Sequence, residues 1–480
     1  MKINELLESR MAASVAAQAK LTEAWAPIIN ASEAYAKKSG KDLSAHHKHM
    51  IAQCCENALM AAGSAKKSRL FETTDSSNID FLGIQLPIIA ALIPSTVLDK
   101  IAITQALDRR SGAIFYLDAQ YAQAKGSISA ASTMMSAKTG HNSTIGGRRY
   151  ASVRVYHETV SGGGSQAKTG TLAYLPYVVG SLTITDGTET FTDDGLGALV
   201  SDASGGVNGT ISAGGVWSVV FATTPGASIY LDYKYNYETK TTSAIPEVNF
   251  DLVAETVTAE DFPLMARYTL AAALDLEKAH GINLEDEVVK YLGGEVRFTM
   301  DHLGIDLIND ASVATGCATS PGTFSATPST GEPWIWKKYS FVDFVEKANQ
   351  NIIAKTLRMQ CTFLIVGNDG ARIIRQLQPN FKPAAGLEGI TPTGPYELGS
   401  LDGRVVIHDP LITTSQVIFG WKGDSLIQGA FLFAPYIPLM TTPTLITATD
   451  LKAQKGFLSS AAYKVINNGA FCRGTISGLA

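Results

Sequence analysis

The stretch at residues 150–237 constrains the fold most, because it reads as a run of short β-strands separated by tight turns. Its last part, IYLDYKYNY at 229–237, alternates side chains with the period of a half-buried strand. Turns rich in Gly and Asp at 161–164, 186–187 and 193–195 separate the earlier strands. The pattern predicts a small antiparallel β-unit inserted into a longer chain.

Helical patterns flank this β-unit on both sides. Apolar side chains recur at helical spacing through residues 1–68, and the polar sequence at 71–78 indicates an exposed hinge after them. Helices are also predicted at 284–308 and 341–357, with a loop of Gly, Ser, Thr and Pro at 309–332 between them. Apolar strands are predicted at 363–367, 405–407, 417–421 and 430–433, and the tail at 460–477 is strand-like.

A further helix is predicted from Thr258 to Gly281. Thr258 and Asp261 have the spacing of a capping box, with Asp in place of the usual Glu. Leu264 and Tyr268 are four residues apart, as on one helix face. Gly281 is typical of the residue that follows a helix end.

Size and charge limit the class of protein. At 480 residues the chain is longer than one typical core allows, so two or three domains are expected. The formal net charge of -5 disfavours a protein that grips nucleic acid over its whole surface. The cysteines are scattered, odd in number and without metal-ligand spacing, which fits a reducing compartment: Cys54, Cys55, Cys317, Cys361 and Cys472.

The most hydrophobic stretch lies at residues 81–98. Gln85, Pro87 and Pro94 interrupt it, and its length is at the lower limit for a transmembrane helix. We therefore expect a segment buried against protein and no membrane partner. The first residues are too polar for the apolar core of a signal peptide.

Two short motifs resemble those of enzymes, but the sequence around each lacks features that the chemistry requires. GGGSQAKT at 162–169 is close to a phosphate-binding loop, but Ala167 replaces the glycine needed before Lys168, and β-forming sequence follows where a helix is required. GDSL at 423–426 spells a motif of one esterase family, yet no histidine follows His408 to activate the serine. We interpret the first as a flexible loop and the second as a tight turn.

A zinc site is conceivable at His46, His47 and His49 with Cys54 and Cys55. Zinc ligands converge tetrahedrally, and two adjacent cysteines rarely both face one ion. A solvated helix face is therefore the preferred interpretation of the histidines.

Three further polar groups have simpler structural explanations. Asp193 and Asp194 lie in a DDG turn without the further carboxylates that calcium needs. His157 and Glu158 have no evident nucleophile partner and read as a pair on a strand surface. GGRRY at 146–150 is a small basic patch, which we interpret as a subunit contact. We predict no catalytic, cofactor-binding or metal-binding residues, and hence a structural protein that is not an enzyme.

Four blocks in a fixed order carry a family resemblance. They are residues 87–121, 250–308, 362–377 and 429–445. They contain G-x-IF at Gly112 to Phe115, DL-x3-HG at Asp275 to Gly281, and APY-x-x-L at Ala434 to Leu439. In this order the blocks resemble the major capsid proteins of T-even-type and related jumbo myovirus phages, which share the HK97-type fold.

The resemblance implies an α+β HK97-type capsid fold. It has an axial domain, a peripheral domain with a long spine helix, an extended loop carrying a β-rich insertion, and an N-terminal helical arm. The implied boundaries are 1–72 for the arm, 73–125 for the N-arm and the start of the peripheral domain, 126–249 for the extended loop with the inserted β-unit at about 172–237, 250–310 for the peripheral domain with the spine helix, 311–440 for the axial domain, and 441–480 for the C-terminal strands returning to the peripheral domain.

The resemblance also implies a function. Copies of the chain are expected to form hexamers and pentamers of an icosahedral shell around double-stranded DNA, which contacts the inner face non-specifically. Scaffold and portal proteins, a maturation protease and decoration proteins are the other expected partners, without cofactors. The expected location is the virion, after assembly in the host cytoplasm.

Capsid proteins of this type are often cleaved after a Leu/Ile-x-Glu sequence. Leu70, Phe71 and Glu72 fit this pattern at the predicted hinge, where an exposed site belongs. The segment LLE at 6–8 also fits. The expected cleavage is after Glu72.

Three alternative functions stay open at this point. An encapsulin-like nanocompartment shell resembles the same fold but stores protein cargo, and it is usually shorter. A hydrolase using Ser425 and a tail or baseplate component are the others.

Overall fold

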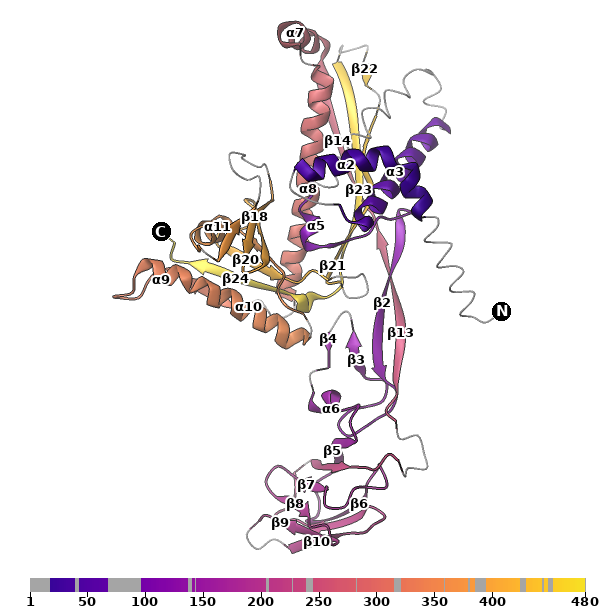
Figure 1. Cartoon of the computed structure of the whole chain (residues 1–480), viewed down its shortest axis with the longest axis vertical. Helices are drawn as coiled ribbons and strands as arrows, with labels where there is room; N and C mark the ends of the chain where they lie inside the picture. Colours follow the sequence, from indigo (N-terminus) through magenta and orange to yellow (C-terminus); the bar gives the residue numbers. More distant parts are fainter. Residues whose placement is uncertain are drawn as a thin grey trace. The chain divides into compact units, whose positions relative to one another are not determined.

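The structure is a computed structural model with two compact units (Figure 1). The first unit comprises Met1–Tyr116 and Ala254–Ala480, and the second comprises Leu117–Val253. Each unit is described by itself. The described residues are 18–38, 43–67, 96–136, 140–142, 144–203, 207–226, 228–238, 245–281, 283–314, 321–357, 359–378, 380–384, 394–423, 429–442, 444–447 and 452–479.

A mixed seven-stranded sheet forms one core of the first unit. Its order is β15-β24-β20-β16-β19-β18-β17, with β15 parallel to β24 and β16 parallel to β19. The strands are β15 (Gly322–Ser325), β16 (Phe363–Val366), β17 (Phe381–Pro383), β18 (Tyr396–Leu401), β19 (Arg404–His408), β20 (Gln416–Gly420) and β24 (Phe471–Ser477). All four residues of β16, FLIV, are buried, as expected of a strand covered on both faces. The strands predicted at 363–367, 405–407 and 417–421 are confirmed.

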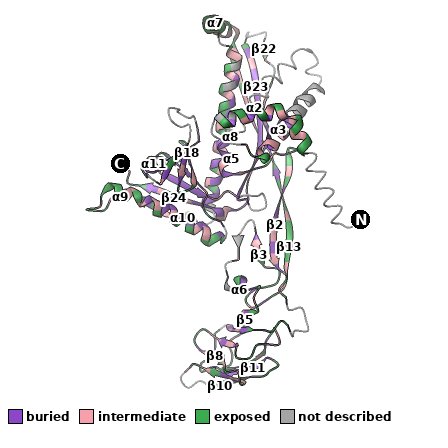
Figure 2. Ribbon diagram, in the orientation of Figure 1, coloured by how far each residue is buried: buried purple, intermediate pink, exposed green. Residues whose placement is uncertain are grey.

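Two helices pack against this sheet. The first, α10 (Phe341–Thr356), buries Phe341, Phe344 and Ile352 on one face, which confirms the helix predicted at 341–357. The second, α11 (Asn368–Ile374), follows β16. In Figure 2 buried residues, coloured purple, occur along the strands of this sheet and along α10.

A five-stranded sheet forms the rest of the first unit. Its order is β1-β21-β23-β14, with β22 paired to β23. The strands are β1 (Ile103–Thr104), β14 (Glu260–Thr269), β21 (Phe431–Thr441), β22 (Leu445–Thr447) and β23 (Lys452–Val465). The strands predicted at 430–433 and in the tail at 460–477 are confirmed here and by β24.

The 31-residue helix α8 (Leu284–Ala314) contributes buried side chains to this core, among them Met300 and Ile308. It confirms the predicted helix at 284–308. Gly304 is required where α5 (Leu98–Ile101) approaches, because a Cβ at residue 304 would lie 2.4 Å from a Leu98 methyl carbon. The close approach leaves Leu98 fully buried.

The helix predicted from Thr258 is wrong over its first half. Residues 260–269 form β14, which pairs antiparallel with β23 from Glu260↔Ala461 to Thr269↔Lys452. Exposure alternates along the strand, with Leu264 and Tyr268 on the more covered face. Residues four apart share a face in a strand as well as in a helix, so this spacing does not separate the two. The pairing available on β23 decided the outcome.

The helix itself, α7, is Leu270–His280. Thr269 is its N-cap, with Oγ1 accepting from Ala272 N at 3.3 Å. The predicted end at Gly281 is confirmed, because this residue has the left-handed φ of 65°.

The loop predicted at 309–332 is also partly wrong. Helix α8 continues to Ala314, and β15 lies within the predicted loop. A six-residue helix that the sequence pattern did not indicate, α9 (Trp334–Tyr339), precedes α10. Its short length leaves too few residues for a periodic signal.

The N-terminal arm is helical, as predicted for residues 1–68 in so far as they are described. It contains α2 (Ala26–Lys38) and α3 (Ala45–Lys67). Ile29, Ile51 and Cys54 form a small core with the half-buried Trp25.

The second unit contains an eight-stranded antiparallel sheet of order β5-β12-β7-β8-β9-β10-β11-β6. The strands are β5 (Arg154–Ser161), β6 (Ala167–Thr171), β7 (Thr183–Thr185), β8 (Thr190–Asp193), β9 (Ala198–Ser201), β10 (Val207–Ile211), β11 (Val216–Val220) and β12 (Ser228–Lys234). The predicted antiparallel β-unit is confirmed. Trp217, Phe191 and Leu231 belong to its own hydrophobic core.

A four-stranded sheet of order β13-β2-β3-β4 accompanies it. The strands are β2 (Ser111–Tyr121), β3 (Thr133–Ser136), β4 (Gly140–His141) and β13 (Val248–Thr258). The boundary between the two units falls within β2 and β13, so both strands belong partly to each unit. A short helix, α6 (Ile145–Arg148), follows β4.

Candidate assembly surfaces

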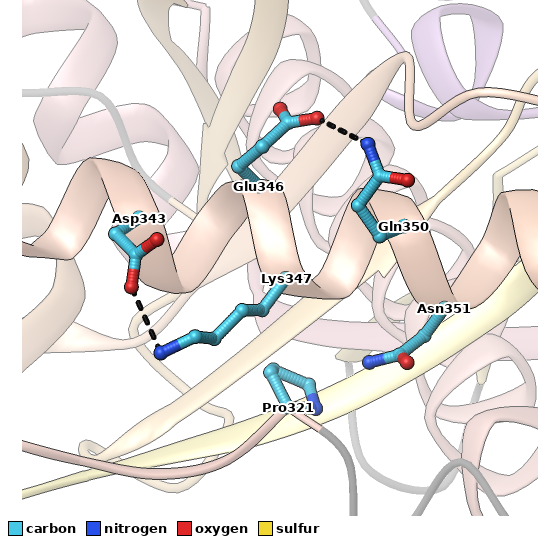
Figure 3. A pocket seen from close by; sticks show the side chains of 6 residues that line it. All are labelled: Pro321, Asp343, Glu346, Lys347, Gln350 and Asn351. Carbon is cyan, nitrogen blue, oxygen red and sulfur yellow. Dashed lines mark hydrogen bonds and ion pairs between the residues drawn. The ribbon is translucent and has the colours of Figure 1, made fainter.

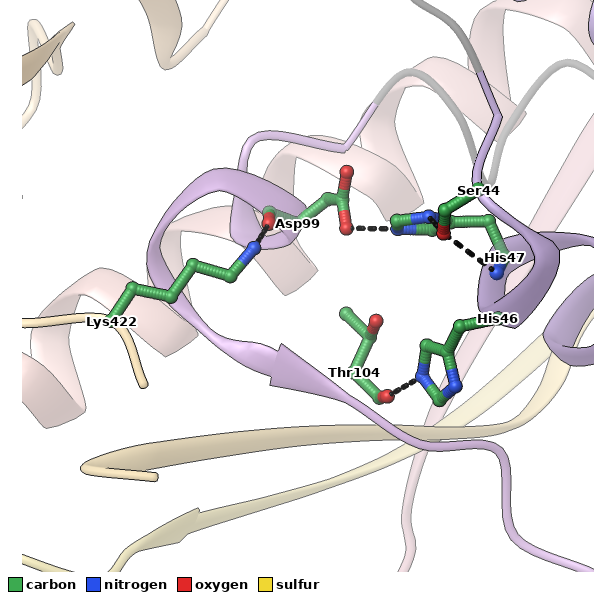
Figure 4. Close-up of polar contacts among 6 residues, drawn as sticks. All are labelled: Ser44, His46, His47, Asp99, Thr104 and Lys422. Carbon is green, nitrogen blue, oxygen red and sulfur yellow. Dashed lines mark hydrogen bonds and ion pairs between the residues drawn. The ribbon is translucent and has the colours of Figure 1, made fainter. Parts of the chain in front are cut away.

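Helix α3 of the arm docks on the segment around β1 (Figure 4). His46 donates from Nε2 to the carbonyl of Thr104, and His47 donates from Nε2 to the carboxylate of Asp99. Ser44 Oγ lies 2.6 Å from His47 Nδ1, so both ring nitrogens of His47 have partners. The backbone carbonyl of Asp99 also accepts from Lys422 Nζ. These contacts fix the start of α3 on the body of the first unit.

The middle of α3 continues the contact. Asn57 Nδ2 donates to the carbonyls of Leu107 at 2.7 Å and Tyr436 at 3.0 Å. Cys54 and Cys55 are buried, and burial raises the pKa of the Cys55 thiol to about 12, so it stays protonated at neutral pH.

The interpretation of the histidines as a solvated helix face is wrong for His47, which is half-buried and bonds to Asp99 of the same chain, whereas His46 is exposed and also bonds to the carbonyl of Thr104. A helical pattern in the sequence does not show which distant part of the chain contacts a given side chain. Among the residues that the structure describes, no three His, Cys, Asp or Glu side chains are grouped to hold a metal ion.

Strand β13 presents apolar side chains to solvent. Phe250 and Leu252 are both exposed and, being two residues apart, lie on one face of the strand. Since β13 is the end strand of its sheet, its outer backbone edge is available for pairing within the described residues. Exposed apolar side chains on an end strand are typical of a surface that another chain covers.

The phosphate-loop candidate at 162–169 is a turn between strands. Gly163 and Gly164 adopt left-handed φ values of 74° and 75° on leaving β5. Lys168 lies in β6, and its Nζ donates to the carbonyl of Gly163 at 2.6 Å. A strand follows the loop, which agrees with the interpretation as a loop.

The acidic pair at 193–194 caps a turn. Asp193 accepts from Gly195 N at 3.0 Å, and Asp194 accepts from Leu196 N at 2.8 Å and Ala198 N at 3.0 Å. These backbone donors lower the pKa of Asp194. The carboxylates therefore satisfy backbone N–H groups, as expected of a DDG turn.

His157 and Glu158 lie at a bulge between β5 and β12. His157 has a left-handed φ of 53° and stacks on the rings of Tyr156 and Tyr230. Its Nδ1 is 3.1 Å from Asp232 Oδ1. Glu158 accepts from Tyr233 Oη at 2.5 Å. The two residues thus act in separate structural contacts of the β-unit.

A pH dependence follows from Glu158. Burial raises its pKa above the usual 4.5, against the hydrogen bonds from Tyr233 and Ala173 N. The folded unit therefore holds a proton that the unfolded chain has lost, and stability falls as pH rises from 4.5 through the folded pKa. We expect Glu158→Gln to stabilise the β-unit at neutral pH and to flatten this dependence, measured by urea unfolding across the window.

Asp194→Asn is the control, because the pH dependence of stability that it removes runs in the opposite direction. Because the folded pKa of Asp194 is lowered, its contribution to stability is present above the unfolded pKa and is lost as pH falls through the folded pKa. A Glu158→Gln protein with an unchanged pH profile contradicts the prediction.

The basic segment at 146–150 carries an anchor residue. Tyr150 is buried, and its hydroxyl lies within hydrogen-bonding distance of the carbonyls of Gln123 at 3.0 Å and Glu247 at 3.1 Å. Arg149 stacks over the ring of Tyr156 at 4.9 Å. That this patch is a subunit contact stays a prediction.

Sequence reasoning missed Lys125, which is buried in the second unit. Its Nζ donates to the carbonyls of Tyr150 at 2.9 Å and Ser152, and it lies 5.1 Å from the centre of the Tyr235 ring. The ammonium group thus links the loop between β2 and β3 to the residues just before β5 and just after β12. A single lysine in a stretch without periodicity offers no signal in the sequence.

Other predicted residues lie at or beyond the limits of the described chain. Of the GDSL segment at 423–426, only Gly423 is described. His408 lies on β19, where its Nε2 is 2.9 Å from Asn368 Oδ1 and burial lowers its pKa. Leu70, Phe71 and Glu72 lie outside the described residues, as does most of the hydrophobic stretch at 81–98. No helix in the described part of the chain has the length and apolar character needed to cross a membrane.

Comparison with known proteins identifies the family. A family model described as major capsid protein Gp23 matches residues 80–475. The major capsid protein of Vibrio phage KVP40 is 24% identical over 228 residues, which cover 44% of this chain and 44% of that protein. The major capsid protein of Enterobacteria phage T4 is 22% identical over 210 residues, or 40% of each chain. The aligned region therefore spans less than half the length of these relatives.

Solved structures of phage capsids are also similar. The capsid of Myoviridae phage XM1 has a TM-score of 0.33 at 9% identity, covering 50% of this chain and 81% of that one. These values are low, and the assignment rests on the family model. The match defines the chain as a structural protein of the virion. It belongs to the Gp23 family of major capsid proteins.

Proposed function

We propose that this chain assembles into the icosahedral head shell that encloses the double-stranded DNA genome of a tailed phage. The observation that carries the proposal is the family match, which extends over residues 80–475 and so includes all of the second unit. Hexamers and pentamers of the chain are the building blocks of such a shell. DNA contacts on its inner face are non-specific, in agreement with the net charge of -5.

The proposed fold is of the HK97 type. Six strands of the mixed sheet, with α10 and α11, lie within the proposed axial domain at 311–440, whereas its seventh strand, β24 (Phe471–Ser477), comes from the C-terminal strands at 441–480. Helix α8, with 31 residues, has the length expected of the spine helix of the peripheral region at 250–310, and it extends past this boundary to Ala314. The β-unit lies within the extended loop at 126–249. The arm at 1–72, the segment at 73–125 and the C-terminal strands at 441–480 complete this division.

Exposed apolar strands support a role in assembly. The side chains of Phe250 and Leu252 on β13 contact solvent in the isolated chain, and a neighbouring copy would remove them from water. Scaffold, portal and decoration proteins are the further partners that the proposal implies.

Negative-stain electron microscopy of the purified protein tests the proposal. We expect closed polyhedral particles, and a stable monomer under all assembly conditions contradicts the function. The contents of particles made in infected cells separate the two shell functions, because packaged DNA supports a phage head and a protein cargo supports an encapsulin-like compartment.

Processing of the arm is a separate prediction. Cleavage after Glu72 produces a subunit that begins at Thr73. Mass spectrometry of intact protein from mature particles is expected to show this shortened chain. Subunits that retain Met1 in mature particles rule the cleavage out.

A further inference from the structure

Four neighbouring strands of the β-unit, β9, β10, β11 and β6, form a surface almost without charge. Among the residues of these strands, all of which the structure describes, only Lys168 is charged. Lys168 lies opposite the buried Val219 on the inner side, and its Nζ donates to the carbonyl of Gly163 at 2.6 Å. The outer side of these four strands therefore carries no charged side chain.

Valines project from this outer side. Val207 is 59% exposed and Val216 is 53% exposed, whereas Trp217, next to Val216, points into the core. Val207 lies directly opposite Val220, so their side chains are neighbours on one face. Thr210 and Ser218 are opposite each other in the middle of the same face. We call this surface the valine face, and its residues are Val200, Val207, Thr210, Val216, Ser218 and Val220.

The acidic side chains near these strands are held in turns. Asp186, Asp194 and Asp202 lie between the strands or just beyond them. Each accepts at least one hydrogen bond from a backbone N–H group, at distances of 2.7 to 3.0 Å. These bonds fix the carboxylates at the turns and leave the valine face neutral.

A shallow depression on α10 shows the contrasting case of a charged surface (Figure 3). Lys347 Nζ is 2.8 Å from Asp343 Oδ2, and Glu346 accepts from Gln350 at 3.0 Å and from Arg404 at 2.9 Å. Its charges are thus already paired within the chain. Mixed charges of this kind keep a surface solvated and separate from other copies. The valine face has none of these groups.

We propose that the valine face of one subunit packs against the valine face of a second copy across a two-fold axis. This inference rests on the proposed function, because the shell supplies many copies at fixed positions. A two-fold contact places one surface against itself, so a charge on it meets its own like charge. A neutral face avoids this repulsion, whereas it offers a charged partner no group to pair with. The occupant that fits is therefore a second copy.

The shape of the face suits this contact. Two sheets pack face to face through interdigitating side chains, at a spacing of about 10 Å. Valine and threonine are compact and have few rotamers, so ordering them on contact costs little conformational entropy. The face is small, and one such contact is expected to be weak. Its effect is multiplied in a shell, where many copies make it at once.

Cross-linking from a single position tests the two-fold contact. We expect Ser218→Cys particles to give, on oxidation, at least about tenfold more covalent dimer than Thr188→Cys particles, because the contact raises the effective concentration of the facing thiols. Thr188 is the matched control, since it is exposed in the turn between β7 and β8. The parent chain gives the background from its own cysteines. Ser218→Cys particles without dimer above this background overturn the inference, as does an equal yield from Thr188→Cys.

Charge exchange tests whether the face meets itself. Val207→Lys combined with Val216→Lys places like charges on both copies, and the same positions changed to Glu do so with the opposite sign. We expect particles of either double variant to disrupt at a lower temperature than the wild type, because charges within about 10 Å repel. Particles assembled from an equal mixture of the two variants should be more heat-stable than either alone. The free subunits should melt near the wild-type temperature, since both valines are exposed. A mixture no more stable than the single variants overturns the inference.

The two proposals fail in different ways. If the wild-type chain forms no shells, the proposed function is contradicted, and the dimer yield of Ser218→Cys in concentrated solution still decides the valine contact. If the wild type forms shells and Ser218→Cys gives no dimer in them, the function stands and the valine contact is wrong.

Discussion

Trp217→Ala is expected to lower the free energy of unfolding of the inserted β-unit by about 3–5 kcal/mol, since it empties a large cavity in a core. Trp217 is 1% exposed and is among the largest fully buried side chains. Its ring lies close against β6, where a Cβ at Gly170 would come within 2.7 Å of it. Gly170 has no side chain that could fill the cavity from β6.

The expected effect is confined to the second unit. The core that contains Trp217 is separate from the core of the first unit. Hydrogen exchange of the Trp217→Ala chain should therefore show lost protection in β5–β12 and retained protection in β16, β20 and β24. Val216→Ala is the matched control, because Val216 is the neighbouring residue on β11 and is 53% exposed. Equal loss of protection in both units contradicts the prediction.

Asp409→Ala is expected to destabilise the first unit by about 2–3 kcal/mol, because it removes a buried carboxylate that two groups bond. Asp409 is 0% exposed. Its Oδ2 lies 3.1 Å from His302 Nδ1, and its Oδ1 accepts from Leu411 N at 2.9 Å. The residue thus connects α8 with the loop between β19 and β20. Its loss leaves the part-buried N–H of Leu411 without this acceptor and His302 without its buried partner.

The control is the second carboxylate that pairs with His302. His302 Nε2 lies 3.3 Å from Asp306 Oδ2, and the side chain of Asp306 is 51% exposed. Asp306→Ala should therefore cost no more than about 1 kcal/mol, as for a surface ion pair. Urea unfolding of the two variants measures the difference. Similar costs for both substitutions would show that burial does not determine the strength of the contact.

The elements predicted correctly from the sequence are those whose side-chain pattern fits one type of secondary structure. Helix α8 has apolar residues at helical spacing over many turns, and β16 is four apolar residues between breaks. In the β-unit, side chains alternate along the strands, and Gly and Asp occupy the tight turns between them. The family resemblance, which the match over residues 80–475 confirmed, depends on the order of such blocks along the chain.

Patterns with two explanations led to errors. Leu264 and Tyr268 fit both a helix and a strand, and the antiparallel partner on β23, almost two hundred residues later, selected the strand. His46 and His47 were interpreted as part of a solvated helix face, but Thr104 and Asp99, which bond them, are more than fifty residues away. No local pattern contains such partners.

The inserted β-unit shows which features follow from the sequence and which follow only from the tertiary structure. The sequence by itself determined its existence, because alternation and turn residues act within a few neighbouring positions. Only the tertiary structure decided that Lys125 is buried among Tyr150 and Tyr235, that the arm docks through α3, and that Trp336 faces solvent. Periodicity states which side chains share a face, whereas the partner that covers that face is set by packing between distant parts of the chain.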